Sequence, residues 1–186
     1  IGRGDIRPGD MIVLNDPYAG GTHLPDITLV SGVFQKGTLR FYVASRAHHS
    51  DVGGMSPGSM PIAEEIYQEG LRIPPVKLVS GGVINKDLWD LILLNVRTPV
   101  EREGDLSAMF ASIRTGERRL LEVVRKYGWT SVNRYVREIL NYSERITRLS
   151  IRAIPDGEYE AEDFLDDDGV RDHPVRIAVK MRIRGD

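Results

Sequence analysis

Residues 27–47 read ITLVSGVFQKGTLRFYVASRA and decide how the first part of the chain folds. Two apolar runs in this stretch flank the four residues Gln35 to Thr38, which include a glycine. Apolar runs of this length around a short glycine-containing turn are typical of a β-hairpin. Folding the chain about the middle of the turn places Asp26 near Ala47 and brings His48 to the same end.

The predicted hairpin brings two polar segments together. Residues 15–26, NDPYAGGTHLPD, lead into it, and residues 47–54, AHHSDVGG, leave it at the same end. Two imidazoles and one carboxylate suit Mn, Fe or Zn and leave coordination positions open for water or substrate. We therefore expect a divalent-metal site that contains His23, Asp26 and a histidine of the second segment.

The choice between the two adjacent histidines is open at this point. Strict strand alternation places His49, two residues beyond Ala47, on the same side as Asp26, and so favours His49 over His48. The competing interpretation is a set of hydrogen-bonded loop residues without a metal, because a single histidine beside an aspartate is more often a turn contact than a ligand.

Composition restricts the classes of protein to which the chain can belong. Of its 186 residues, 41% are hydrophobic and 28% are charged, which is typical of a soluble globular protein. A net charge of -2 without a basic segment argues against a nucleic-acid partner. No apolar run approaches the roughly 20 residues of a membrane span, and we expect a cytoplasmic location. Without cysteine, any metal must be held by His, Asp or Glu.

The remaining sequence predicts helices and then a second hairpin. Apolar residues at helical spacing predict one helix from residue 85 and a second helix from Asp105 to Gly128. A third helix is expected from Thr130, antiparallel to the second, with the apolar stripes of both in the core. Strands at 158–165 and 175–183 flank the acidic loop DDDG, which we interpret as a solvated loop in preference to a calcium site.

These elements predict an α+β fold in three regions. Residues 1–84 form a β-rich region with the metal-site hairpin, residues 85–154 a region of antiparallel helices, and residues 155–186 the start of a C-terminal β region. The chain opens without methionine and its last strand stops abruptly, so we expect it to be a fragment of a larger protein.

Other kinds of catalytic site are poorly supported. Ser50, His48 and Asp51 do not make a convincing triad, because adjacent side chains point apart and no nucleophile elbow is present. The glycine pairs do not form a phosphate loop, so any ATP must bind elsewhere. Glu69 and its neighbours Glu64 and Glu65 are candidates for a general base.

Several long strings resemble the hydantoinase B/oxoprolinase family, which includes the B-type component of N-methylhydantoinase, the C-terminal half of 5-oxoprolinase and the metal-bearing component of acetone carboxylase. The strings are NDPYAGGTHLPDITLV at 15–30, RAHHSDVGGMSPGSMP at 46–61, IYQEGLRIPPVKL at 66–78 and NVRTPVEREGDLSA at 95–108. Their order and length make the match specific, and it extends from Asp5 to the end of the chain.

The resemblance implies particular ligands. In the acetone carboxylase member, the metal is held by the His and Asp of the HLPD string and the first His of the AHH string. These positions are His23, Asp26 and His48 here. The resemblance thus favours His48, and leaves His49 and Asp51 as residues behind the metal ligands or facing the substrate.

The resemblance also implies a partner and a reaction. A hydantoinase A-type subunit or domain uses ATP to phosphorylate the substrate, so we expect a hetero-oligomer in which this piece alone is inactive. Phosphorylation of a cyclic amide such as hydantoin or 5-oxoproline would activate its carbonyl for attack by water at the metal. The alternatives are an ATP-dependent ketone carboxylase and a non-catalytic structural or binding module. The sequence does not identify the metal, the substrate or the oligomeric state.

Overall fold

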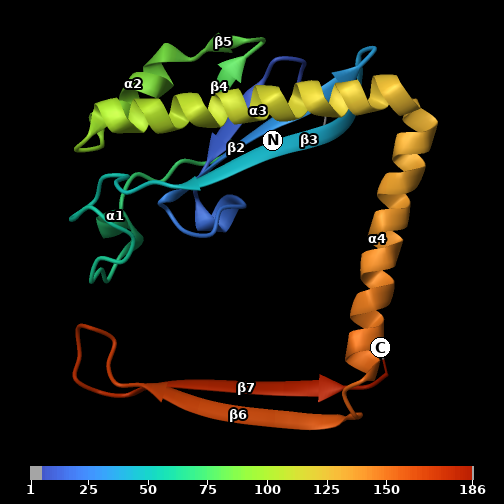
Figure 1. Ribbon diagram of the computed structural model, residues 1–186. Helices are drawn as coiled ribbons and strands as arrows, with labels where there is room; N and C mark the ends of the chain where they lie inside the picture. The colour runs from blue at the N-terminus through green and yellow to red at the C-terminus, as the bar shows by residue number, and fades with distance from the viewer. Residues whose placement is uncertain (1–5, 186) are drawn as a thin grey trace. The chain divides into compact units, whose positions relative to one another are not determined.

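The computed structural model of the protein describes residues 6–185 (Figure 1). Residues 1–5, where the sequence opens without methionine, and residue 186 lie outside the described part. The chain divides into two compact units, Ile1–Val123 and Val124–Asp186, and each is described by itself. No helix in the described part is long and apolar enough to span a bilayer.

The first unit is built on a five-stranded antiparallel sheet in the order β3-β2-β1-β4-β5. The strands are β1 (Met11–Leu14), β2 (Asp26–Gln35), β3 (Thr38–His48), β4 (Val76–Ser80) and β5 (Val83–Ile84). The predicted hairpin is β2–β3. Its turn residues Lys36 and Gly37 both have positive φ, 50° and 76°, which is the backbone twist that two-residue hairpin turns require.

The register of β2–β3 differs from the prediction by one residue. Phe34 pairs with Leu39 as expected, but Val33 then pairs with Phe41, so β3 contains one extra residue at a β-bulge. From there to the end of the ladder every pair is displaced, and Asp26 lies opposite His48 instead of Ala47. A bulge inserts one residue into one strand only, and symmetrical folding about the turn does not include it.

Two short helices lie between the strands of the sheet, and two longer helices follow them. The short helices are η1 (Pro17–Ala19) and α1 (Ile66–Glu69), and the longer ones are α2 (Lys86–Leu94) and α3 (Pro99–Tyr127). The predicted start of α3 at Asp105 was wrong. The helix begins at Pro99, where the missing N–H of proline costs nothing, and the Arg102 amide donates to the carbonyl of Thr98.

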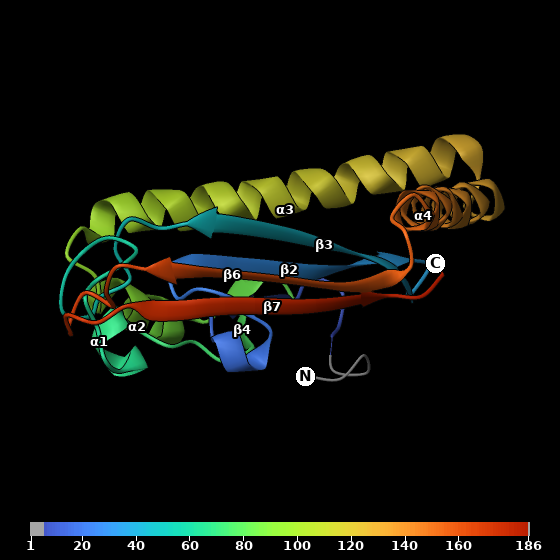
Figure 2. The ribbon, with the colours of Figure 1, turned by 90° about the horizontal axis from the view of Figure 1, so that it is seen from below.

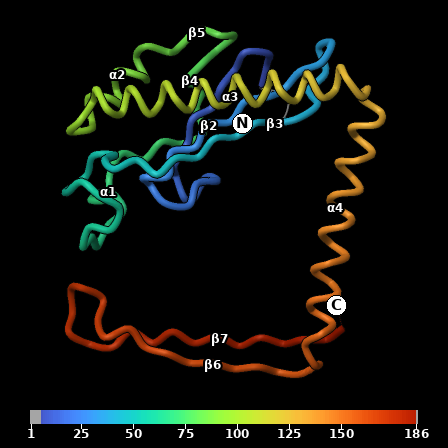
Figure 3. Tube along the Cα trace, in the orientation of Figure 1, coloured from blue at the N-terminus to red at the C-terminus, as the bar shows by residue number. Residues whose placement is uncertain are grey.

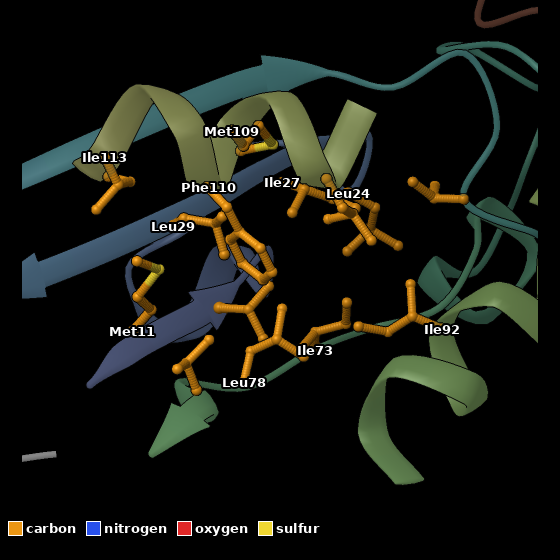
Figure 4. Packing of buried hydrophobic residues seen from close by; sticks show 14 residues of the cluster. Met11, Leu24, Ile27, Leu29, Ile73, Leu78, Ile92, Met109, Phe110 and Ile113 are labelled. Carbon is orange, nitrogen blue, oxygen red and sulfur yellow. The ribbon is translucent and has the colours of Figure 1, made fainter. Parts of the chain in front are cut away.

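The core of the first unit lies between the sheet and α3. Figure 4 shows Met109, Phe110 and Ile113 of α3 directed toward Ile27 and Leu29 of β2. These five residues are at most 9% exposed, so the apolar stripe predicted for this part of α3 is buried as expected. α3 runs along β3 in both views (Figures 1 and 2). The opposite face of the sheet is free of this helix.

The second unit consists of the last turn of α3, helix α4 (Trp129–Arg152) and the hairpin β6 (Gly157–Leu165) and β7 (Val175–Ile183). The C-terminal hairpin and its exposed acidic loop are confirmed. The expectation that the apolar stripe of α4 lies in the core was wrong: the stripe is exposed, with Ile139 and Leu140 each at 64%, because a unit this small has little interior. The antiparallel arrangement of α3 and α4 spans the unit boundary and stays a prediction. The mixed α+β fold itself is confirmed.

Candidate metal centre

A tight turn places His23 and Asp26 side by side. The Asp26 amide donates to the carbonyl of His23 at 2.9 Å, which closes the turn directly before β2. Between them, Leu24 is 1% exposed and belongs to the hydrophobic core, so it anchors the turn. Because Leu24 is buried, the polar side chains of His23 and Asp26 remain at the start of β2.

The side chain of Asn15 holds the turn between His23 and Asp26 in place. The sequence analysis did not predict this role. Its side chain is fully buried and donates to the carbonyls of Leu24 and Leu71, both at 2.8 Å. Its carbonyl oxygen accepts from the Ile73 amide at 2.6 Å. The Asn15 side chain thus joins the end of β1, the turn between His23 and Asp26 (the ligand turn) and the segment before β4. The only sequence signal was its place in a turn-forming string.

The end of β3 supplies the third member of the group. His48 pairs with Asp26 across the ladder, and its Nδ1 lies 2.7 Å from Oδ1 of Asp26. The rings of His23 and His48 are 5.4 Å apart between centroids, at 36°. Figure 3 shows that the loop before β2 and the chain leaving β3 lie at the same end of the hairpin, away from its turn.

Among residues 6–185, these three side chains form the group of His, Asp and Glu donors close enough to share a metal ion. One ligand atom from each of His23, Asp26 and His48 lies within 4.8 Å of the others. Ligands about 2.1 Å from one ion are at most about 4.2 Å apart, so small side-chain rotations would suffice. The donor set suits Mn, Fe or Zn.

One nitrogen of each imidazole has a polar partner. The Nε2 of His23 lies 2.6 Å from the carbonyl oxygen of Ser59, which can only accept, so Nε2 carries the proton and Nδ1 is available as a ligand. The Asp26 carboxylate accepts from Nδ1–H of His48, a bond that joint coordination of one ion by the two side chains would replace. A backbone carbonyl behind an imidazole is a common support for a metal-ligating histidine.

His49 does not join the group, and the preference for it over His48 from strand alternation was wrong. It is 2% exposed, its Nε2 lies 3.5 Å from Sδ of Met109, and its Nδ1 has no hydrogen-bond partner. Burial lowers the pKa of His49 and so disfavours the charged form of the ring. The bulge in β3 is the physical reason, since it places His48 opposite Asp26 and sends His49 toward the core.

Asp51 lies outside the group and is tied to Arg97 instead. Its carboxylate accepts from the backbone amides of Arg97 and Gly53 and forms an ion pair with the Arg97 guanidinium at 2.9 Å. Burial alone would raise the pKa of Asp51, but the two amides and the Arg97 charge hold it below its usual value. Arg97 also donates to the carbonyl of Gly54 at 2.8 Å. This clamp fixes the loop after β3 to the segment before α3.

The structure does not bring Ser50 or Glu69 into the group. Ser50 accepts a hydrogen bond from the guanidinium of Arg102, and no Ser-His-Asp arrangement forms among the described residues. Glu69 is the last residue of α1 and is partly buried. Its role as a general base stays a prediction.

The His48–Asp26 pair is open to water. The side chains of His48 and Asp26 are 48% and 25% exposed. A pair this open to water contributes little to stability, on the order of 0–1 kcal/mol. The surrounding turn, the Asn15 amide and the Arg97 clamp therefore hold in place a polar group whose own bonds hardly stabilise the fold.

Known proteins are similar to this chain over nearly its whole length. The chain is 39% identical over 186 residues to a Pseudomonas sp. (strain NS671) protein provisionally named as the B-type component of a D-/L-hydantoinase, covering 97% of this chain and 31% of that protein. It is also 39% identical over 183 residues to the beta subunit of caprolactamase from Pseudomonas jessenii, covering 98% and 32%. The chain thus spans about a third of the length of these relatives.

Solved structures show the same fold. The crystal structure of ATP-dependent caprolactamase from P. jessenii superposes with a TM-score of 0.91 over 98% of this chain and 32% of that one, at 39% identity. A nucleotide-free acetone carboxylase structure gives a TM-score of 0.82 over 98% and 26%, at 21% identity, which shows the fold alone. The family profile of Hydantoinase B/oxoprolinase matches residues 1–186, and the chain belongs to this family.

Proposed function

We propose that the full-length protein is the metal-bearing subunit of an ATP-dependent cyclic-amide hydrolase, of the hydantoinase or oxoprolinase type. The observation that carries this proposal is the group of His23, Asp26 and His48, in a chain 39% identical to the beta subunit of caprolactamase over nearly its whole length. The ligand strings predicted the same three residues.

The relatives are named as subunits, which supports a partner for this protein too. The sequence has no phosphate loop. We therefore assign ATP binding to a hydantoinase A-type subunit or domain. A hetero-oligomer follows, in which the present residues supply the hydrolytic site.

The proposed reaction couples ring opening to ATP. The terminal phosphoryl group of ATP passes to the amide oxygen, a first water adds to the carbonyl carbon, and the ring C–N bond breaks as the nitrogen takes up a proton, which leaves an acyl phosphate. A second water then hydrolyses the acyl phosphate to a carboxylate and phosphate. The products are an open-chain amino acid derivative, ADP and phosphate. A divalent ion bound at this site would supply Lewis acidity at the carbonyl oxygen and a lowered pKa for water.

The residues of this chain have distinct parts in that proposal. The imidazoles of His23 and His48 and the Asp26 carboxylate would hold the ion. The short contact between Nδ1 of His48 and Oδ1 of Asp26 brings two of these groups together. His49 and Asp51 act as positioning residues behind the loop, and Glu69 remains the candidate that exchanges a proton with the substrate.

The test uses the full-length protein with its partner subunit and ATP. Hydantoin, 5-oxoproline and caprolactam are supplied separately, and the ring-opened product and phosphate are measured. In parallel, a ketone is supplied with labelled bicarbonate. Ring opening of any cyclic amide, with no label fixed, is the expected result.

Two outcomes would overturn the proposal. Fixation of label into the ketone would make the protein a ketone carboxylase. Full ring-opening activity and full metal content in both His23→Ala and His48→Ala would leave the site as a non-catalytic module, with catalysis elsewhere in the complex.

A further inference from the structure

Arg46 lies beside the proposed metal ligands on the same face of the sheet. It precedes His48 by two residues on β3 and pairs with Thr28, which follows Asp26 by two residues on β2. Side chains two apart on a strand share a face and are separated by about 7 Å. The guanidinium is therefore one step along the strands from the His48–Asp26 pair.

Two threonines fix the guanidinium in place. Arg46 Nε donates to Oγ1 of Thr28 at 2.9 Å, and Nη1 donates to Oγ1 of Thr22 at 3.3 Å. The Thr28 hydroxyl in turn donates to the backbone carbonyl of Asp26 at 3.2 Å, and Thr22 precedes His23. The orientation of Arg46 is thus tied to the residues that carry the ligands.

Arg46 keeps most of its hydrogen-bonding capacity. A guanidinium has five N–H donors, and the two threonines engage two of them, which leaves both donors of Nη2 and one of Nη1. Within residues 6–185, no carboxylate forms an ion pair with Arg46. Arginines near the same end of the hairpin differ, since Arg72 is paired with Asp16 and Arg97 with Asp51.

A fixed, exposed guanidinium without an acidic partner is suited to an anionic ligand. Two N–H groups on one edge match two oxygens of a phosphoryl group in a bidentate arrangement. We propose that Arg46 binds the phosphoryl group of the activated substrate while the reacting carbonyl lies at His23, Asp26 and His48. This assignment deepens the proposed function, on which it rests, and names its substrate class, an O-phosphorylated cyclic amide.

The experiment measures binding of inorganic phosphate to the full-length complex by calorimetry, with saturating ADP to fill the nucleotide site of the partner. Acetate is titrated in a second arm, as a carboxylate of the same charge type. The variants are Arg46→Gln and Arg46→Lys. Arg114→Gln is the matched control, because Arg114 is exposed on α3, which covers the other face of the sheet. Metal content is measured for every variant.

We expect Arg46→Gln to weaken phosphate binding at least tenfold with unchanged metal content, Arg46→Lys to weaken it less, and Arg114→Gln to have no effect. Wild-type phosphate affinity in metal-replete Arg46→Gln would overturn the assignment. So would weakened acetate binding with unaffected phosphate binding, which would make Arg46 a carboxylate anchor. If the wild-type complex opens no cyclic amide but binds phosphate, and Arg46→Gln loses that binding, the Arg46 site is supported while the proposed function fails.

Discussion

Asp26 and His48 face each other directly across the β2–β3 ladder, with Oδ1 of Asp26 2.7 Å from Nδ1 of His48. A one-residue displacement of β3 would place Ala47 or His49 opposite Asp26 in place of His48. The pairing is therefore set by the backbone register, and the two side chains meet without help from any flexible loop.

Removal of either member of this pair should abolish metal binding. Asp26→Asn and His48→Gln in the full-length protein should each reduce metal content at least tenfold, because each substitution removes one proposed ligand and the contact that orients the other. Metal content after dialysis, measured by mass spectrometry, provides the test. The control is His173→Gln, a histidine in the exposed loop between β6 and β7. Retention of metal by both ligand variants would contradict the assignment.

Asn15→Asp should destabilise the ligand turn although it changes a single group. The new carboxylate would face the carbonyl oxygens of Leu24 and Leu71, where the amide now donates. Loss of these buried bonds should lower the local free energy of opening by about 2–4 kcal/mol. Hydrogen exchange of the Ile73 amide in the full-length protein measures it. Asn85→Asp is the matched control, because at this N-cap the side chain only accepts, from the Leu88 amide. Equal protection in both variants would refute the role of Asn15.

The Asp51–Arg97 clamp should make the first unit sensitive to acid. The pKa of Asp51 is lower in the folded protein than its ordinary value of 3.8, so near that pH the unfolded chain binds more protons. The stabilisation is complete well above pH 3.8 and is lost as pH falls through the lower folded pKa. Asp51→Asn should therefore reduce the pH dependence of stability below about pH 4.

The measurement is acid unfolding of the full-length protein, followed by fluorescence or hydrogen exchange. Asp90→Asn, at an exposed position on α2, is the control and should leave the acid profile unchanged. An Asp51→Asn profile as steep as that of the wild type would show that the clamp does not contribute to acid unfolding.

Two glycines of α3 should respond in opposite ways to alanine. Gly104 has open space around it, so Gly104→Ala should raise the free energy of unfolding by about 0.5–1 kcal/mol through helix propensity. A Cβ at Gly116 would lie 2.7 Å from Cγ1 of Val43 on β3, and Gly116→Ala should destabilise by about 1–3 kcal/mol. Denaturant unfolding of the full-length protein compares them. Stabilisation by both substitutions would mean that α3 does not approach β3 this closely.

Local sequence signals were sufficient for the hairpin and for the two polar segments at its end. Alternating apolar runs and a glycine-containing turn are short-range features, and so is the turn that joins His23 to Asp26. The C-terminal hairpin was predicted for the same reason. The family resemblance added the choice of His48, which alternation alone had given to His49.

The remaining features depend on contacts between distant residues. Arg97 lies 46 residues beyond Asp51, so no local pattern could show that this aspartate serves a clamp. Asn15 looked like an ordinary turn residue because its three bonds reach segments as far away as Ile73. The start of α3 was placed too late because the apolar residues at helical spacing begin only after Asp105, whereas the helix begins at Pro99, where proline is favourable.

The extra residue of β3 determines which side chains at the end of the strand face solvent and which face the core. His48 and His49 are chemically identical neighbours, and the count of residues between the turn and the site decides which one faces solvent and which one faces the core. An insertion or deletion of one residue in β3 would turn His48 toward the core and His49 toward solvent. The two histidines lie roughly 30 Å from the turn, at a rise of about 3.3 Å per residue. A change of two residues would keep the alternation but would place Arg46 or Ser50 opposite Asp26 in place of His48. The Asp26–His48 pair is therefore retained only where a length change in β3 is matched in β2 or absorbed by the turn or a bulge.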